Sequence, residues 1–193
     1  MTENLINEEV EYATFWNRAG AYILDAFFLI LITGVINFIN ISNYKSFILY
    51  LPFALIGICY KPFMESYYGA TIGKMVLKLK VTNKNFEKID ITTSILRSLI
   101  LIFPAVMYVP IYYMAFNNPN LADLNGLMEF SKALSAEYSM LGIIGNLSMI
   151  LIIADIIFLL TDSTKTQRSL HDRIANTYVI SDKKDKNTLG NNV

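Results

Sequence analysis

Four long apolar stretches dominate this sequence and restrict what it can fold into. They run from Asn17 to Ile39, from Phe47 to Phe63, from Ile95 to Phe116 and from Leu141 to Leu160. A helix that crosses the hydrocarbon core of a bilayer needs about 20 largely apolar residues. The second stretch is the weakest, because its unbroken apolar part is short and contains Pro52. We therefore predict an all-α membrane protein, a bundle of four transmembrane helices set in a lipid bilayer.

Composition supports this fold class and excludes several functions. Apolar residues make up 54% of the 193 residues and charged residues only 17%, whereas a soluble domain is about 45–50% apolar even with Gly included. The 16 basic residues are balanced by 16 acidic ones, which argues against nucleic-acid binding. The sequence has one Cys, Cys59, and one His, His171, so it can form neither an intrachain disulfide framework nor a Cys- or His-rich metal cluster. We expect no metal, no cofactor and no enzyme activity, because His171 has no Gly-x-Ser-x-Gly nucleophile motif to serve.

The distribution of Lys and Arg predicts how the chain is oriented. Fourteen of them lie in the loop from Lys61 to Arg97, in the segment after Leu160 or at Arg18, and the other connections carry only Lys45 and Lys132. Basic residues favour the cytoplasmic side. We predict that both ends of the chain and the middle loop are cytoplasmic. The acidic segment 1–16 lacks Lys and Arg, so we interpret it as a cytoplasmic tail rather than a signal peptide.

The connections between the predicted spans contain short ordered elements. Apolar and polar residues alternate from Leu77 to Thr82, which is typical of a half-buried strand, and Thr177–Ile180 is a second β-prone run. We predict that they pair as a small cytoplasmic sheet; the alternative is two amphipathic stretches lying on the headgroups. The external loop Asn117–Met140 has apolar residues at helical spacing, and we expect a short surface helix. Residues 181–193 form a polar tail that we expect to be disordered.

Charged residues inside the apolar stretches are the candidates for function. They are Arg18, Asp25, Arg97 and Asp155, and all four lie near the predicted cytoplasmic ends of their spans. Such residues rarely face lipid and usually face a bundle interior. They fit a charge-neutral clamp between helices, an ion or proton site, or a site for a lipid headgroup or partner. We predict that Asp25 faces the interior and interacts with Arg97 or Arg18, directly or through water.

Three sequence blocks resemble the RDD family of bacterial membrane proteins. The first is Asn17-Arg18-Ala19 with Asp25, the second Gly69-Ala-Thr-Ile-Gly73-Lys74, and the third Arg168-Ser-Leu-His171-Asp172-Arg173-Ile-Ala-Asn-Thr177. The second block is no phosphate-binding loop, since three residues separate its glycines and Met75 replaces the required Ser or Thr. The resemblance spans residues 17–180, and Asn176 departs from an expected Gly. The family motif residues are Arg18, Asp25, Gly69, Thr71, Gly73, Lys74, Arg168, His171, Asp172 and Thr177.

The resemblance implies a multi-pass protein of the bacterial cytoplasmic membrane. It maps the family's Arg to Arg18, its first Asp to Asp25 and its second Asp to Asp172, with Asp155 as the alternative. It also implies transport of ions or small solutes, with cation/proton exchange as the most specific form. Four spans without an internal repeat enclose little space, so a transporter of this size is expected to form homo-oligomers. The rival function is an accessory subunit that binds a partner membrane protein or anionic lipid through its basic loop and tail.

Overall fold

The computed structural model describes residues 10–124, 126–162, 164 and 166–181. It contains four helices long and apolar enough to cross a membrane: Phe15–Tyr44, Phe47–Tyr68, Ile91–Phe116 and Met140–Thr161. The first joins α1 (Phe15–Leu29) and α2 (Val35–Ile39) through the π-helical turn Ile30–Gly34 and ends in a second one, Asn40–Tyr44. The other three are α3 (Phe47–Tyr68), α5 (Ile91–Phe116) and α8 (Met140–Thr161). The predicted helical membrane fold is confirmed, and each helix is longer than its apolar stretch.

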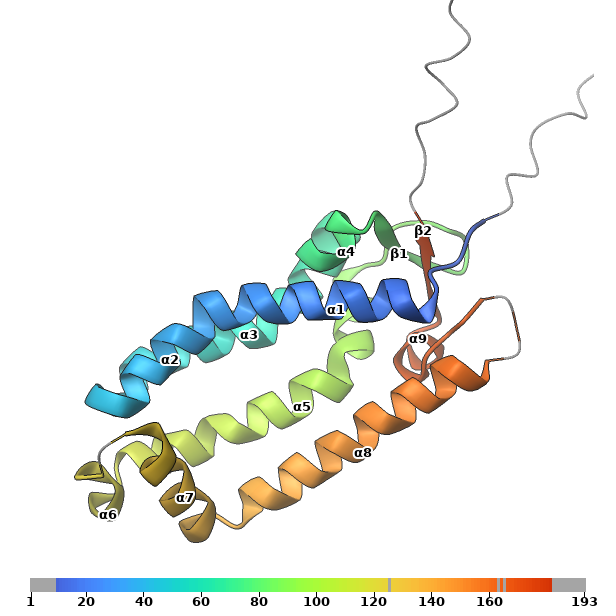
Figure 1. Ribbon diagram of the computed structural model, residues 1–193. Helices are drawn as coiled ribbons and strands as arrows, with labels where there is room; N and C mark the ends of the chain where they lie inside the picture. The colour runs from blue at the N-terminus through green and yellow to red at the C-terminus, as the bar shows by residue number, and fades with distance from the viewer. Residues whose placement is uncertain (1–9, 125, 163, 165, 182–193) are drawn as a thin grey trace, which may run out of the picture.

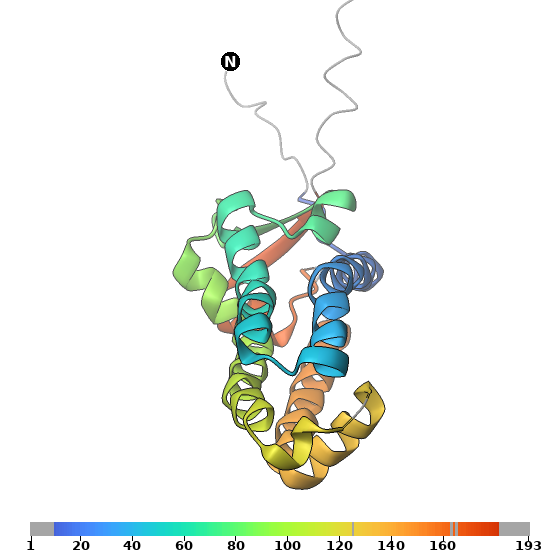
Figure 2. The same cartoon turned by 90° about the vertical axis from the view of Figure 1, so that its left-hand side faces the viewer.

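The four long helices lie side by side and leave the connecting elements at two opposite ends (Figures 1 and 2). Helix α5 packs against both α3 and α8, whereas α1 packs mainly against the short helix α4 (Ile72–Val76). Helices α6 (Pro119–Ala122) and α7 (Leu127–Glu137) connect α5 to α8 at one end. The other end, called the sheet end below, carries α9 (Leu170–Ile174) and the two strands. The surface helix expected in the loop after α5 is α7.

The apolar cores of the molecule lie at its ends rather than along the spans. One cluster at the sheet end includes Val81 and Val179, and the other packs Phe130 and Leu134 of α7 against the end of α5. Between them, many apolar side chains face outward: Ile23, Ile48 and Ile143 are 67%, 86% and 66% exposed. Hydrocarbon, which is as apolar as these side chains, is the medium that such a surface suits.

The sheet consists of two antiparallel strands, β1 (Leu79–Asn83) and β2 (Thr177–Ser181), with Val81 opposite Val179. The predicted pairing is confirmed. Its predicted start at Leu77 is wrong, because Leu77 caps α4 and Lys78 takes a left-handed φ of 54° before the strand begins. The chain before α1 joins the other edge of β2, where the Ala13 N–H donates to the Val179 carbonyl at 2.9 Å. Segments from both ends of the chain therefore meet in one layer.

Two glycines shape the passage from α3 into the sheet, but in different ways. Gly69 ends α3 with a φ of 75°, a left-handed conformation that glycine adopts without penalty, as the sequence predicted. Gly73 instead permits a close approach of two backbones. A Cβ atom there would lie 2.1 Å from the Ala21 carbonyl oxygen and 3.0 Å from the Asp25 carboxyl carbon. The contact between α4 and α1 therefore requires a residue without a side chain.

Replacing Gly73 with Ala is expected to destabilise the protein by about 1–3 kcal/mol or more, since the new methyl group must push α4 away from α1. Gly142→Ala in α8 is the matched control, because no atom lies within 4 Å of the Cβ that it would add. Thermal unfolding of both variants in detergent checks the prediction. An equal response of the two variants would contradict the close packing of α4 on α1.

Candidate functional site: a charged cavity at the sheet end

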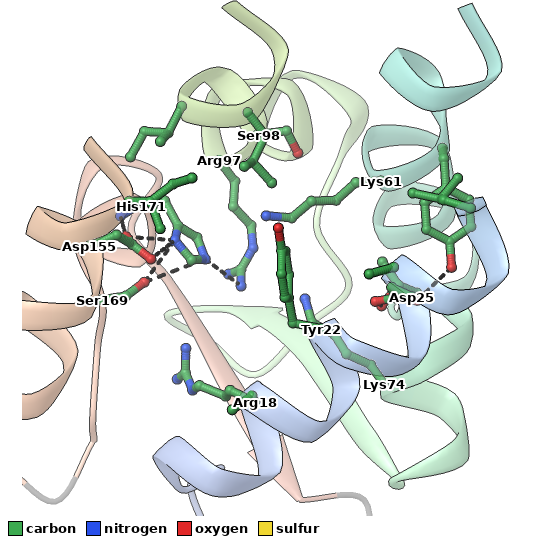
Figure 3. A pocket seen from close by; sticks show the side chains of 18 of the residues that line it. Arg18, Tyr22, Asp25, Lys61, Lys74, Arg97, Ser98, Asp155, Ser169 and His171 are labelled. Carbon is green, nitrogen blue, oxygen red and sulfur yellow. Dashed lines mark hydrogen bonds and ion pairs between the residues drawn. The ribbon is translucent and has the colours of Figure 1, made fainter. Parts of the chain in front are cut away.

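A cavity of about 560 Å³ lies among the four long helices near the sheet end. Its wall is largely apolar along the spans, with side chains such as Ile23, Leu101 and Ile156. Charged and hydroxyl side chains gather on the rest of the wall (Figure 3). They are Arg18, Tyr22, Asp25, Tyr60, Lys61, Thr71, Lys74, Arg97, Ser98, Asp155, Ser169 and His171. The cavity therefore contains all four charged residues that the sequence singled out in the spans.

Asp172 joins two of the predicted arginines. Its carboxylate pairs with the guanidinium of Arg18 and lies 2.5 Å from Nη1 of Arg97. Asp172 is fully buried and Arg97 only 1% exposed. Burial acts to raise the pKa of Asp172, but Arg97 and Arg18 outweigh it and hold that pKa well below its usual value. The carboxylate therefore stays ionised and ties α9 to α1 and α5.

Local sequence places Asp172 in this position. Ser169 precedes α9 and forms a capping box with Asp172, whose carboxylate accepts the Ser169 N–H at 3.2 Å. Such reciprocal bonds satisfy the free N–H groups at a helix start. Arg168 then donates to the carbonyl oxygens of Asp172 and Thr177 at 3.1 and 3.2 Å. The closing block of the sequence is thus folded into a compact turn that presents one carboxylate to two spans.

Glu65 is a second buried carboxylate in the cluster, and sequence reasoning missed it. Its Oε2 lies 2.9 Å from Nε of Arg97, and its Oε1 pairs with the ammonium of Lys74. Burial lowers the pKa of Lys74 to about 8, against the opposing effect of Glu65. The predicted second span stopped at Phe63, so Glu65 was counted as loop. The spacing of Lys61 and Glu65, one helical turn apart, was the signal for a continuing helix with a charged face.

Asp155 and His171 form a pair on the cavity wall. Nδ1 of His171 lies 2.8 and 2.9 Å from the two carboxylate oxygens of Asp155, whose Oδ1 also accepts the His171 backbone N–H. On the other side of the ring, Nη2 of Arg97 lies 3.2 Å from Nε2. Arginine can only donate, so Nε2 must accept and the proton of a neutral imidazole sits on Nδ1. Burial agrees with this state, because it lowers the pKa of His171 to about 4.

The lowered pKa of His171 predicts a pH dependence of stability. An unfolded chain takes up the imidazole proton near pH 6.5, whereas the folded chain does so only near pH 4. Between these values the unfolded state binds more protons, so the free energy of unfolding should fall as the pH falls. Thermal midpoints of the wild type and of His171→Gln, measured from pH 7.5 to 4.5, test this. The wild type should lose more stability on acidification than the variant, and parallel curves would contradict the assignment.

Asp25 faces the cavity as predicted, but it forms no direct interaction with Arg18 or Arg97, so of the two predicted forms only contact through water stays a prediction. Its carboxylate accepts hydrogen bonds from the Tyr60 hydroxyl at 2.6 Å, the Thr71 hydroxyl at 2.6 Å and the Gly73 N–H at 2.7 Å. The two arginines are already taken up by Asp172 and Glu65. Asp25 thus fastens α1 to α3 and α4 through neutral donors.

The remaining motif residues support the cluster from outside the cavity. The Thr177 hydroxyl, at the start of β2, accepts a hydrogen bond from Nη1 of Arg97 at 2.6 Å. Asn176 takes a left-handed φ of 51°, and its side-chain oxygen accepts a bond from Arg168 at 3.1 Å. Asn tolerates this conformation better than most residues, which explains how it replaces the expected Gly. Among the described residues no group of three or more His, Cys, Asp or Glu could hold a metal ion.

Four candidate spans around a cavity lined by ionisable groups define a multi-pass helical membrane protein. The sequence model of the RDD family matches residues 12–176, and the chain therefore belongs to the RDD family. This match covers every motif residue except Thr177, which follows it directly. Searches of curated proteins and of solved structures gave no match to this chain.

Proposed function

We propose that this RDD protein transports ions or small solutes across a bacterial cytoplasmic membrane and that the cavity is the solute-binding site. The observation that carries the proposal is that every one of the four spans contributes at least one charged side chain to the cavity wall. These are Arg18 and Asp25 from the first span, then Lys61, Arg97 and Asp155 from the other three. Charged residues at membrane depth are costly and are found mainly along solute or proton pathways. A homo-oligomer, or a partner membrane protein, would extend the cavity into a full pathway.

Cation/proton exchange is the most specific form of this proposal. It needs a carboxylate that can exchange a proton for a cation, and the cavity wall offers Asp25 and Asp155. Asp155 is the better placed, because its side chain is 20% exposed and bonded to a neutral imidazole that can pass on a proton. Asp25 accepts hydrogen bonds from three protein donors, which favours a structural role for its carboxylate.

Proton movement in liposomes tests this form of transport. The purified chain is reconstituted with a pH-sensitive dye inside, and Na⁺, K⁺ or an uncharged osmolyte is added outside. We expect cation-dependent dissipation of an imposed pH gradient, abolished by Asp155→Asn and retained by Asp123→Asn on the exposed loop. Wild-type liposomes that respond no differently from empty ones, with every cation, would contradict exchange.

The orientation proposed for this function places the sheet end in the cytoplasm, as the basic bias predicts. Asn43 and Asn85 are both exposed and lie at opposite ends of the molecule. In a Cys59→Ser background, Asn43→Cys should react with a membrane-impermeant thiol reagent in intact cells, and Asn85→Cys should react only after the cells are opened. The reverse pattern would invert the topology.

An accessory role is the second candidate, favoured by the exposed lysines Lys78 and Lys84 outside the spans at the sheet end. Such residues can hold anionic headgroups or an acidic partner protein. The double variant Lys78→Gln, Lys84→Gln separates the two functions. It should leave ion movement in liposomes unchanged if the protein transports, and it should release the bound partner or lipid surface if the protein is an accessory.

A further inference from the structure

The cations of the cavity are unequally neutralised. Lys74, Arg18 and Arg97 each pair with a buried carboxylate. Lys61, by contrast, has no hydrogen-bond or ion-pair partner within the part of the chain that the structure describes, although its side chain extends into the same space (Figure 3). An ammonium group at this depth is expected to have a partner. The structure thus contains an ammonium group that forms no direct ion pair with a described residue, although Glu65, Asp172 and Asp155 attract it from a greater distance.

Two further polar groups on the wall lack partners. Nη2 of Arg18 and Oγ of Ser98 are buried and form no hydrogen bond with any of the residues that the structure describes. Figure 3 shows Lys61, Arg97 and Ser98 on neighbouring turns of α3 and α5, with Arg18 on the opposite side of the space. The Lys61 ammonium, Nη2 of Arg18 and the Ser98 hydroxyl can each donate a hydrogen bond, so a hydrogen-bond acceptor would satisfy all three.

The carboxylates of the cluster are engaged by other protein groups in the state that the structure shows. Glu65 and Asp172 are fully buried behind the arginines and do not line the cavity. The oxygens of Asp155 face His171, and those of Asp25 accept three hydrogen bonds. The wall therefore presents spare donors and cations, while its negative charge is already engaged. This is the chemistry of a site for an anionic oxygen group.

The apolar part of the wall indicates what such an anion is attached to. Tyr22, Ile23 and Ile30 of the first span line the cavity and are 59%, 67% and 61% exposed. The cavity therefore opens along the lipid-facing side of the span. Lys61 lies seven residues before the end of α3 at Tyr68, a depth of about 10 Å at about 1.5 Å per residue. That is near the boundary between hydrocarbon and headgroups, where a phospholipid places its phosphate.

We infer that the cavity binds the anionic phosphate of an amphiphile, with Lys61, Ser98 and Arg18 as its donors and the apolar wall along its acyl chains. A phospholipid headgroup is the source that the lipid-exposed wall favours, and free phosphate shares the same polar chemistry. The inference goes beyond the proposed transport and does not rest on it, because it concerns what the cavity holds in the absence of any gradient.

Lipid binding to the purified full chain tests the inference. Delipidated protein in neutral detergent is titrated with phosphatidylglycerol, phosphatidylcholine or inorganic phosphate, and bound species are counted by native mass spectrometry. We expect phosphatidylglycerol to bind about tenfold more tightly than phosphatidylcholine. Lys61→Gln should weaken phosphatidylglycerol binding about tenfold, the effect of losing one charge-assisted hydrogen bond. Lys61→Arg should retain it, and Lys132→Gln, which removes an exposed lysine of α7 outside the cavity, should leave it unchanged.

The possible outcomes distinguish a lipid phosphate from a soluble anion, and both of these from the absence of an anion site. Inorganic phosphate that binds with the same dependence on Lys61 and displaces the lipid supports the anion site and assigns it to a soluble anion. Phosphatidylglycerol affinity that is the same in the wild type, Lys61→Gln and Lys132→Gln overturns the inference. Ser98→Ala, which removes a hydroxyl and no charge, should weaken binding severalfold, so the inference remains testable if Lys61→Gln unfolds. If the wild type binds lipid as expected but shows no ion flux in liposomes, the result counts against the proposed transport and leaves the lipid-binding inference intact.

Discussion

Replacing Asp172 with Asn is expected to destabilise the protein more than any other single change considered. The carboxylate compensates two arginines, Arg18 and Arg97, and is itself fully buried. Removing one partner of a buried ion pair leaves an uncompensated charge and typically lowers the free energy of unfolding by about 3–5 kcal/mol. The capping box at the start of α9 is weakened as well, because the neutral amide keeps only one of the two acceptor oxygens. Thermal unfolding in detergent, with the fraction of monodisperse protein as a second readout, measures the effect.

The matched control for this change is Asp123→Asn, which alters the same side chain at an exposed position and should shift stability by less than about 0.5 kcal/mol. Adding Arg18→Gln to Asp172→Asn should restore part of the loss, because one of the two stranded charges is removed. An Asp172→Asn variant as stable as the control would show that the cluster does not hold α9 against the spans.

Removing the Asp25 side chain is expected to have the second-largest effect on stability. In Asp25→Ala, the hydrogen-bond donors of Tyr60, Thr71 and Gly73 lose their acceptor, and the hydrogen bonds that join α4 to α1 are lost. Each unsatisfied buried group costs about 1–3 kcal/mol, so the loss should be clear in thermal unfolding. Asp25→Asn should cost less, because the amide oxygen can keep the bonds from Tyr60 and Gly73 while the Thr71 hydroxyl turns to accept from the amide.

This pair of variants also separates a structural role of Asp25 from a transport role. In the structural role, Asp25→Asn retains both fold and ion flux, and adding Arg97→Gln brings no rescue, since Arg97 is not the partner of Asp25. Abolished flux in a folded and stable Asp25→Asn variant would instead assign the transported proton or cation to Asp25.

Much of the architecture could be predicted from hydropathy and pairing patterns alone. The number of spans followed from the apolar stretches, and the sheet followed from alternation before Asn83 together with the β-branched run from Thr177. The ends of the helices could not be predicted this way, because Glu65 and Lys74 look like loop residues until the fold pairs them with each other and brings Arg97 of a neighbouring span to Glu65. The spacing of apolar residues indicates which residues are buried away from water, but it does not indicate which charged side chains pair with one another.

The candidate site was predicted in its members but not in its connections. Arg18, Asp25, Arg97 and Asp155 do line one cavity, because charges in spans avoid lipid. The pairing of both arginines with Asp172 depends on the closing segment folding back under the bundle, a long-range contact that no local pattern encodes. The neutral partners of Asp25 depend on a backbone approach that only Gly73 permits.

The measurement that tests the central claim most directly is whether blocking the cavity stops solute movement. In a Cys59→Ser background, Ser98→Cys places a thiol on the buried wall, and Gly142→Cys places one on the exposed face of α8. Both variants are labelled with a small methanethiosulfonate reagent in liposomes, and ion flux is followed with labelling confirmed by mass spectrometry. If the cavity is the pathway, labelling at Ser98→Cys abolishes flux and labelling at Gly142→Cys leaves it intact. Undiminished flux through protein fully labelled at Ser98→Cys would contradict the claim.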